Sequence, residues 1–527
     1  MRAAREDPVG AFEVSKTRRE LQVVTSVIYC LLGAGVVFGY AALKPVLIEE
    51  GVYKEYCTEK ELDKGVRVCF EQELRLNFMF TAAAVATNVC ALVVGAILDF
   101  YGPRVTGIIG SIFIGIGSLL FAYARKIDAF DAYVPGYLFL ALGGPFIFIP
   151  SFQLSNAFPA SSGLILSMLT GAFDSSSAVF LFYRLAYERW SHILSLRTFF
   201  LGYLVVPLFI LVVQIFIMPP TSYKTVGELV KQVEEAEQRL AGEDRYADED
   251  DDEYDDDEQL LRRERRESVV SEITSLLGSK GASRHQQKEE TKREVSGVWG
   301  AMHGKSVYEQ MLSPWYILIL LFTIVQMTRI NYFVATIRPQ YEYLLGSVNK
   351  AILVNEFFDI ALPVGGLCAV PFIGMLLDKT ATPTVLLVLV GVASATGVLG
   401  LLRDIWAAYA NVILFVLYRP FYYTAISDYT AKVFGFQTFG TIYGSIICVA
   451  GIFNFAQTGM DAATAKWFHH DPRPINLILL IFVSVIGGIL WMWVTVKSKK
   501  LKRTLLEEEA NRAMANENIM PGGYGGF

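Results

Sequence analysis

The ten most informative residues of the chain read Gly95-Ala96-Ile97-Leu98-Asp99-Phe100-Tyr101-Gly102-Pro103-Arg104. They close one long apolar run and open the next. Gly95 would let a neighbouring helix approach closely, and Gly102-Pro103 is typical of a tight turn. We therefore predict two helices joined by a short turn, with Arg104 within reach of Asp99 so that the two form an ion pair.

A shortened copy of this motif occurs in the second half of the chain. It reads Gly374-Met375-Leu376-Leu377-Asp378-Lys379 and again ends a long apolar run. The same motif at corresponding places in two halves indicates an internal repeat. We expect the two copies to act as a latch that stabilises one conformation, through Gly95, Asp99, Gly102, Arg104, Gly374, Asp378 and Lys379.

The apolar residues of the chain are gathered into long runs. Hydrophobic residues make up 53% of the 527 positions, and the mean hydropathy is +0.40. Runs of about 20 apolar residues are long enough to cross a bilayer as helices. We predict an all-α membrane protein with twelve transmembrane helices in two pseudo-symmetric six-helix bundles. The predicted spans are 21–48, 76–98, 105–124, 133–154, 163–187, 198–218, 314–334, 353–377, 383–402, 405–426, 436–457 and 475–496.

These spans divide the chain into five parts. They are a tail (1–20), a first bundle (21–218), a central loop (219–311), a second bundle (312–496) and a second tail (497–527). The central loop contains an acidic run, Glu243 to Glu258, which dominates the net charge of −6 and has nothing to bury, so we predict disorder there. Ser268 and Ser271 follow a cluster of arginines in this loop and are candidate kinase sites.

Charge and cysteine placement indicate an orientation. Segments 1–20 and 497–503 are rich in lysine and arginine, and such segments stay in the cytoplasm. We therefore place both termini and the central loop in the cytoplasm, and the loop after the first span outside, in a plasma or vacuolar membrane. In that outer loop Cys57 and Cys69 form either a disulfide or two free thiols.

The motif at 95–104 resembles the loop between helices 2 and 3 of the major facilitator superfamily. Three further segments, 169–180, 418–423 and 439–444, resemble the solute carrier family 43 branch of that superfamily, with its fungal relatives the most similar in pattern. That branch includes system-L-type large neutral amino acid transporters and a purine nucleobase transporter. The resemblance implies two bundles that rock against each other, and uniport or weakly coupled transport of a zwitterionic or neutral solute.

Polar side chains inside the predicted spans are candidates for substrate contacts, because they are costly there unless they are paired or face a cavity. Arg329 and Asp359 are expected at similar depth on neighbouring helices, so a structural ion pair between them is an alternative to a substrate role. For Arg419 the alternative is a pair with a nearby acid such as Asp428. The candidates are Tyr40, Gln153, Asp174, Arg329, Asn331, Tyr332, Arg419, Tyr423, Asn454 and Gln457.

The sequence offers little for enzyme chemistry. Its five histidines fall in predicted loops, away from metal-ligand spacing inside a span, and it has no glycine-rich phosphate loop. We expect a small-molecule substrate and the lipid bilayer as partners, and neither nucleic acid, metal nor cofactor. Two alternatives to a facilitator remain. One is a proton-coupled symporter of a nucleobase or monocarboxylate in which Asp174 or Glu356 titrates, and the other is a non-transporting nutrient sensor.

Overall fold

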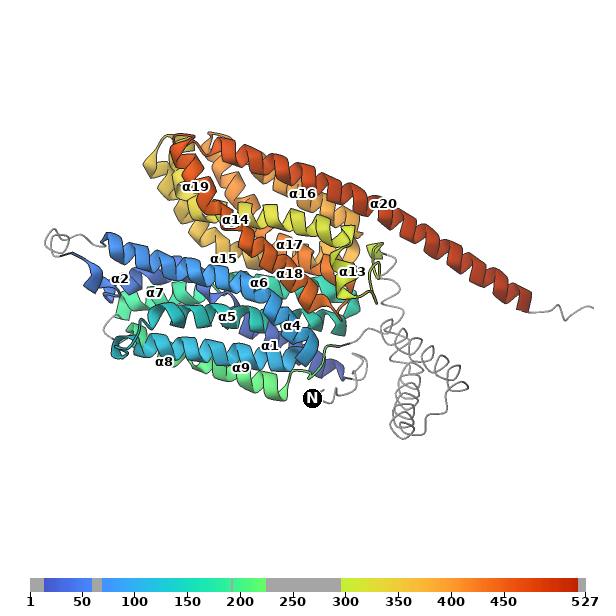
Figure 1. The fold of residues 1–527 in the computed structure, drawn as a ribbon, viewed down its shortest axis with the longest axis horizontal. Helices are drawn as coiled ribbons and strands as arrows, with labels where there is room; N and C mark the ends of the chain where they lie inside the picture. Colours follow the sequence, from blue (N-terminus) through green and yellow to red (C-terminus); the bar gives the residue numbers. More distant parts are fainter. Residues whose placement is uncertain (1–13, 59–68, 191–192, 224–294, 520–527) are drawn as a thin grey trace, which may run out of the picture.

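The computed structural model describes residues 14–58, 69–190, 193–223 and 295–519, and helices dominate them (Figure 1). The acidic run and the candidate kinase sites Ser268 and Ser271 lie outside the described residues. The helices form two bundles that lie side by side, with the first half of the chain in one bundle and the second half in the other.

The first bundle begins with a span broken into four pieces. Its elements are α1 (Lys16–Tyr29), a π segment (Cys30–Ala34), a 3₁₀ segment (Val36–Gly39), α2 (Tyr40–Glu49), a 3₁₀ turn (Lys54–Tyr56), α4 (Phe70–Tyr123), a 3₁₀ turn (Ala124–Lys126), α5 (Tyr133–Ser151), two 3₁₀ segments (Phe152–Ala157 and Pro159–Ser161), α6 (Ser162–Ser175), α7 (Ala178–Trp190), α8 (Leu196–Tyr203) and α9 (Val205–Phe216).

The second bundle contains longer, less interrupted helices. Its elements are α13 (Val307–Met311), α14 (Pro314–Leu345), α15 (Val348–Lys379), α16 (Thr382–Leu399), α17 (Ile405–Phe434), α18 (Phe439–Phe453), α19 (Ala456–Lys466) and α20 (Arg473–Ile519). Helix α20 runs well beyond the predicted end of the last span at Val496, so the part of the tail up to Ile519 continues that helix.

The predicted twelve-span architecture is confirmed. Nine of the described helices are long and apolar enough to cross a membrane, or ten when the bent α1–α2 pair counts as one span. Helix α4 contributes two legs, because Gly102 (φ 82°, ψ 175°) turns the chain back in the middle of it. The short apolar α18, continued by α19, supplies the twelfth span.

Gly102 is required at this turn for two reasons. Its positive φ is readily adopted only by glycine, and a Cβ there would collide with the carbonyl of Pro220. Pro103 then opens the second leg, where its missing N–H needs no partner. The motif therefore forms the predicted turn between two antiparallel legs.

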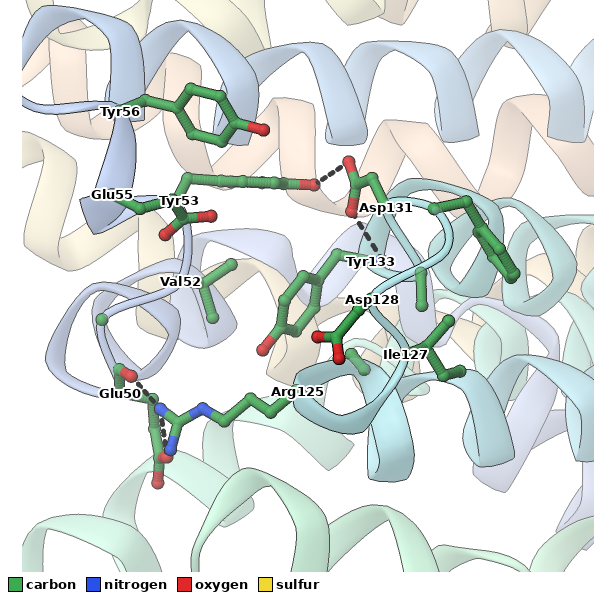
Figure 2. A pocket seen from close by; sticks show the side chains of 14 residues that line it. Glu50, Val52, Tyr53, Glu55, Tyr56, Arg125, Ile127, Asp128, Asp131 and Tyr133 are labelled. Atoms are coloured by element: carbon green, nitrogen blue, oxygen red, sulfur yellow. Dashed lines mark hydrogen bonds and ion pairs between the residues drawn. The ribbon is translucent and has the colours of Figure 1, made fainter.

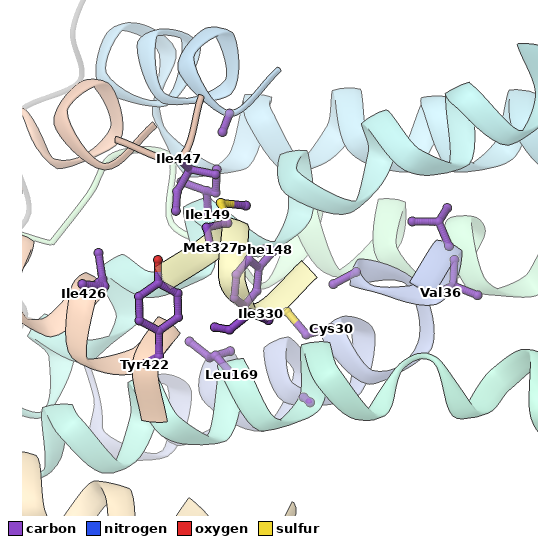
Figure 3. Close-up of a cluster of buried hydrophobic side chains, with 14 of the residues drawn as sticks. Cys30, Val36, Phe148, Ile149, Leu169, Met327, Ile330, Tyr422, Ile426 and Ile447 are labelled. Carbon is purple, nitrogen blue, oxygen red and sulfur yellow. The ribbon is translucent and has the colours of Figure 1, made fainter. Parts of the chain in front are cut away.

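An apolar cluster joins the two bundles (Figure 3). Phe148 and Ile149 of α5 and Leu169 of α6 meet Met327 and Ile330 of α14 in this cluster. Side chains of both bundles thus share one core.

The molecule has two distinguishable ends along the helix direction. We call the end that carries Asp99 and Asp378 the latch end. At the opposite end, the disulfide end, Cys57 and Cys69 form a disulfide with their Cα atoms 5.6 Å apart. This bond closes the loop between the first two spans.

Candidate functional site

The first copy of the motif joins the two bundles at the latch end. The carboxylate of Asp99, on α4, accepts hydrogen bonds from the backbone N–H of Gly440 (3.0 Å) and of Thr441 (2.7 Å) and from the Thr441 hydroxyl (2.6 Å). These residues lie in the first turn of α18, whose backbone N–H groups have no partner inside the helix. A negative charge is stabilised there by the helix dipole as well.

The second copy repeats this arrangement with the bundles exchanged. The carboxylate of Asp378, at the end of α15, accepts hydrogen bonds from the backbone N–H of Gly163 (2.7 Å) and Leu164 (3.1 Å). Both residues lie in the first turn of α6. Each bundle therefore places one carboxylate on the start of a helix of the other bundle.

The predicted ion pair between Asp99 and Arg104 is wrong. Arg104 instead donates from Nε (3.1 Å) and Nη2 (2.8 Å) to the carbonyl of Met218, just after α9. Its side chain fastens the end of the sixth span to the turn at Gly102. Lys379 is exposed at the end of α15.

A buried ion pair supports the end of α15. The ammonium of Lys432 lies 2.6 Å from Asp428, four residues earlier on α17, and both side chains are at most 4% exposed. The same ammonium donates to the carbonyl of Leu377 (3.1 Å), the residue before Asp378. Lys432 thereby fixes the backbone that presents Asp378 to the other bundle.

Glycines allow the helix backbones to touch along both inter-bundle contacts. A Cβ on Gly95 would collide with the carbonyl of Gly440, and a Cβ on Gly440 would lie 2.6 Å from the Asp99 carboxylate. In the other contact, a Cβ on Gly163 would lie 2.6 Å from Cβ of Leu377. No larger residue fits these positions without moving the helices apart.

A second ion pair crosses between the bundles near the middle of the helices. Nη1 of Arg419, on α17, lies 3.6 Å from Oδ1 of Asp174, on α6. The Asp174 side chain is 2% exposed and that of Arg419 11%. Neither carboxylate oxygen of Asp174 has a hydrogen-bond partner, and Nε of Arg419 has none either. The predicted alternative, an ion pair between Arg419 and Asp428, is wrong, because Asp428 pairs with Lys432.

A network of aromatic rings begins beside this central pair. Tyr423, one turn after Arg419, interacts electrostatically with both charges. Phe173 precedes Asp174 and lies 4.5 Å from Phe148, measured between ring centroids. Tyr443 of α18 lies near Tyr423, and its ring centroid is 5.5 Å from that of Phe152. Both charges are buried, and their attraction is stronger in such a low-dielectric site than it would be in water.

Three of the other predicted contacts have partners inside a single bundle. The hydroxyl of Tyr40 donates to the carbonyl of Leu76 (2.6 Å). The side chain of Gln153 accepts from the backbone N–H of Tyr223 (3.1 Å) and so holds the start of the central loop. The hydroxyl of Tyr332 pairs with that of Thr464 (3.0 Å).

Arg329 is also bound within its own bundle. It donates to the carbonyl of Ala393 (2.6 Å) and to the hydroxyl of Thr396 (2.8 Å), in the last turns of α16. The positive charge thus lies at the negative end of a helix dipole. Asp359 instead accepts from Asn355 (3.0 Å), so the predicted Arg329–Asp359 pair is wrong.

Two of the remaining candidates, Asn454 and Gln457, lie at the break between α18 and α19, and the third, Asn331, lies on α14. Asn454 caps α18 there, and its side-chain oxygen has no hydrogen-bond partner. Gln457 and Asn331 are half-buried. None of these three is brought into contact with Asp174 or Arg419 by a hydrogen bond among the described residues.

A cavity of about 750 Å³ opens at the disulfide end (Figure 2). It lies between the loops after α2 and before α5, where Arg125 pairs with Glu50 (3.0 Å) and the Tyr53 hydroxyl donates to Asp131 (2.7 Å). All its lining residues belong to the first bundle. A site that is exposed in turn to the two sides by rocking must lie between the bundles, so this cavity is not our candidate for it.

Sequence analysis missed the backbone partners of the two aspartates. Gly163, Gly440 and Thr441 begin helices, and helix starts have a recognisable pattern. That pattern does not say which distant carboxylate will reach them.

Comparison with known proteins gives a consistent picture of the chain as a whole. No family model matches it. Over 485 residues it is 45% identical to protein FMP42 of Saccharomyces cerevisiae, covering 91% of this chain and 95% of the other.

More distant relatives carry names of transporters. The chain is 23% identical to arginine transporter 1 of Toxoplasma gondii (95% of this chain, 92% of the other). It is also 23% identical to equilibrative nucleobase transporter 1 of Bos taurus (88% and 93%). Among solved structures, a major facilitator superfamily proton:xylose symporter superimposes with a TM-score of 0.56 at 12% identity, covering 91% of this chain and 95% of the other.

Proposed function

Since this chain belongs to the family of protein FMP42 and has the major facilitator fold, we propose that it is a secondary transporter of small organic solutes, and specifically of large neutral amino acids. The observation that carries the proposal is the ion pair between Asp174 and Arg419, which spans the two bundles. The relatives and structural neighbours are transporters rather than enzymes.

The chemistry of the pair favours a zwitterion. Removing either partner of a buried ion pair leaves an uncompensated charge, which costs about 3–5 kcal/mol. An amino acid carries both charges, so its carboxylate can bind Arg419 while its ammonium binds Asp174. A monocarboxylate would engage Arg419 and leave Asp174 unpaired, and a neutral nucleobase would satisfy neither charge.

The surroundings favour a large apolar side chain. Tyr423 lies beside the pair, and a network of aromatic rings extends from it through Tyr443, Phe152, Phe148 and Phe173. Burying an aromatic or branched side chain against such rings contributes roughly 1.5–3 kcal/mol. This is the basis for choosing large neutral amino acids over small or charged ones.

The latch fits alternating access. Asp99 and Asp378 hold the bundles together at one end, so the central pair is closed off from that side. Lysines and arginines of segments 16–19 and 497–503 lie at this end, and by the positive-inside rule we place the latch end and both termini in the cytoplasm. Transport then requires both latches to open as the other end closes.

The Asp174–Arg419 pair also bears on whether solute transport is coupled to a proton gradient. With the site empty, Asp174 and Arg419 neutralise each other, so the carrier can reorient without a bound ion. This favours uniport. In the alternative, a proton on Asp174 would release Arg419 and couple transport to a pH gradient.

Uptake into liposomes tests the proposal. Purified protein would be reconstituted and offered labelled leucine, phenylalanine, histidine, adenine and a monocarboxylate, with and without a proton gradient. We expect uptake of leucine and phenylalanine that needs no gradient and falls by more than about a hundredfold in Arg419→Ala, since 3–5 kcal/mol is lost. Arg338→Ala, whose exposed pair with Glu342 lies within one helix, is the matched control.

Two outcomes would overturn parts of this proposal. Uptake that depends on a proton gradient and loses that dependence in Asp174→Asn would replace uniport by symport. Uptake of adenine alone, undiminished in Arg419→Ala, would contradict the assignment of amino acids as substrates.

A further inference from the structure

The contact between α6 and α15 ends halfway along the molecule. It runs from the Asp378 latch through the close approach of Gly374 to Leu164, and its last hydrogen bond joins the Ser175 hydroxyl to the carbonyl of Pro363 (3.2 Å). Helix α6 ends at Ser175, and α7 follows from Ala178 after a two-residue interruption of the same span. Within the described residues no hydrogen bond or ion pair joins α7 to α15.

Opposite charges face each other beyond this point. Arg184 of α7 lies nine residues past Ser175, and Glu356 of α15 lies seven residues before Pro363. At 1.5 Å per residue these positions are about 14 Å and 10 Å beyond the last contact. Asp359 lies on the same face of α15 as Glu356. It is near enough to Arg184 for an electrostatic interaction, although Asp359 and Arg184 form no ion pair.

Two of these three charges, Arg184 and Asp359, have a partner on their own helix in this state. Arg184 pairs with Glu188 (2.8 Å), one turn away on its own helix, and both side chains are more than a third exposed. Asp359 accepts from Asn355 (3.0 Å), one turn away on α15. Exposed pairs within one helix are weak, so exchanging them for other partners costs little.

We propose that Arg184 pairs with Asp359 and Glu356 across the bundles when the latch opens, and so closes the path at the disulfide end. Closure brings α7 against α15 and removes water between them. Two acids there would repel each other unless a cation is shared between them. Arg184 supplies that cation from the opposite bundle. This proposal rests on the proposed function only in requiring two alternating conformations, whatever the solute.

Cross-linking tests the proposal without any substrate. Cysteines at Leu181 and Ile352, each about one turn from Arg184 or Glu356 on the same helix, report the approach of α7 to α15 while the charges and their local partners stay in place; the exposed native Cys368 is changed to serine. We expect little cross-linking by a short bifunctional thiol reagent with the latch intact. Adding Asp99→Asn and Asp378→Asn should raise it about 25-fold, about fivefold for each carboxylate. A cysteine pair at Glu50 and Arg125, which lies within one bundle, should not change.

The charge requirement is tested on the same background. Arg184→Glu should abolish the rise, Arg184→Gln should reduce it, and Arg184→Glu combined with Asp359→Arg should restore it. Size-exclusion chromatography verifies that each variant is folded. A rise that persists in Arg184→Glu, or no rise after the latch is broken, would overturn the proposal. Because the readout needs no solute, a wrong substrate assignment would leave it unaffected.

Discussion

The two halves of the inter-bundle contact differ in what holds them. At the latch end, α4 meets α18 and α6 meets α15 with glycines at the contact, and two carboxylates bind helix starts. Toward the disulfide end, α6 stops at Ser175 and α18 at Phe453, and the facing charges have partners on their own helices. Directional bonds join the bundles in one half, and among the described residues no hydrogen bond or ion pair joins them in the other.

The chemistry of the latch suits a lock that must open repeatedly. Each aspartate binds backbone N–H groups rather than an arginine or lysine of the other bundle. When such a contact breaks, the helix start and the carboxylate can both be hydrated, and no buried charge of opposite sign is left unpaired. A buried ion pair is far more costly to separate; at the latch end, Lys432 and Asp428 form such a pair inside one bundle.

That internal pair should give the largest effect on stability. Lys432→Met leaves Asp428 charged and buried, which costs about 3–5 kcal/mol. We expect the purified variant to show the largest loss of thermal stability of the changes considered. The double variant Lys432→Met with Asp428→Leu should recover much of that loss while uptake stays impaired, since Asp378 is still mispositioned. Equal stability of Lys432→Met and wild type would refute a buried pair.

The next largest effect should come from filling a glycine contact in the locked half. Gly440→Leu forces α18 from α4, and overpacking of this kind costs about 1–3 kcal/mol. We therefore expect uptake to fall about tenfold or more. Gly459→Leu on α19, where a Cβ meets nothing within 4 Å, is the matched change in the other half and should leave uptake nearly unchanged. Similar losses of uptake in both variants would contradict the claim that close helix packing matters in one half of the contact and not in the other.

Neutralising the latch carboxylates should have an intermediate effect. Asp99→Asn and Asp378→Asn each weaken a charge interaction with a helix start that contributes about 1 kcal/mol. We expect each to favour the open latch about fivefold, and the double variant to multiply the two effects because the sites are separate. Alkylation of a cysteine placed at Ser167, which is buried between α6 and α15, measures this opening. Unchanged alkylation in the double variant would show that the two carboxylates do not hold the bundles together at the latch end.

The smallest effect on the latch is expected at Arg104. Its bonds to the Met218 carbonyl are part-buried and lie within the first bundle, so removing them breaks no contact between the bundles. We expect Arg104→Ala to lower thermal stability and to leave the alkylation rate at Ser167→Cys unchanged. If Arg104→Ala opened the latch as Asp99→Asn does, Arg104 would be part of the latch, as the sequence motif predicts.

Sequence alone located the spans and the latch but not the partners. Runs of apolar residues fix where helices cross, and the repeated glycine–aspartate spacing identified Asp99 and Asp378. Their partners are backbone N–H groups, which every residue but proline carries, so the residue type does not identify them in the sequence. For the same reason the carbonyl partners of Arg329 and Arg104 could not be foreseen.

The central pair shows the other limit. Asp174 and Arg419 were both identified as candidates because charges are rare inside spans. They are separated by 245 positions, and only the packing of α6 against α17 brings them together. The aromatic residues around them have no distinguishing pattern, since phenylalanine and tyrosine occur throughout the spans.

Competition by modified amino acids tests the central claim most directly. Uptake of labelled phenylalanine into liposomes would be measured with an excess of phenylalanine, of its amide, or of N-acetylphenylalanine. The amide lacks the carboxylate that should bind Arg419, and the acetyl compound lacks the ammonium that should bind Asp174. The account predicts that only phenylalanine competes strongly. Equal competition by all three would contradict a site built on the Asp174–Arg419 pair.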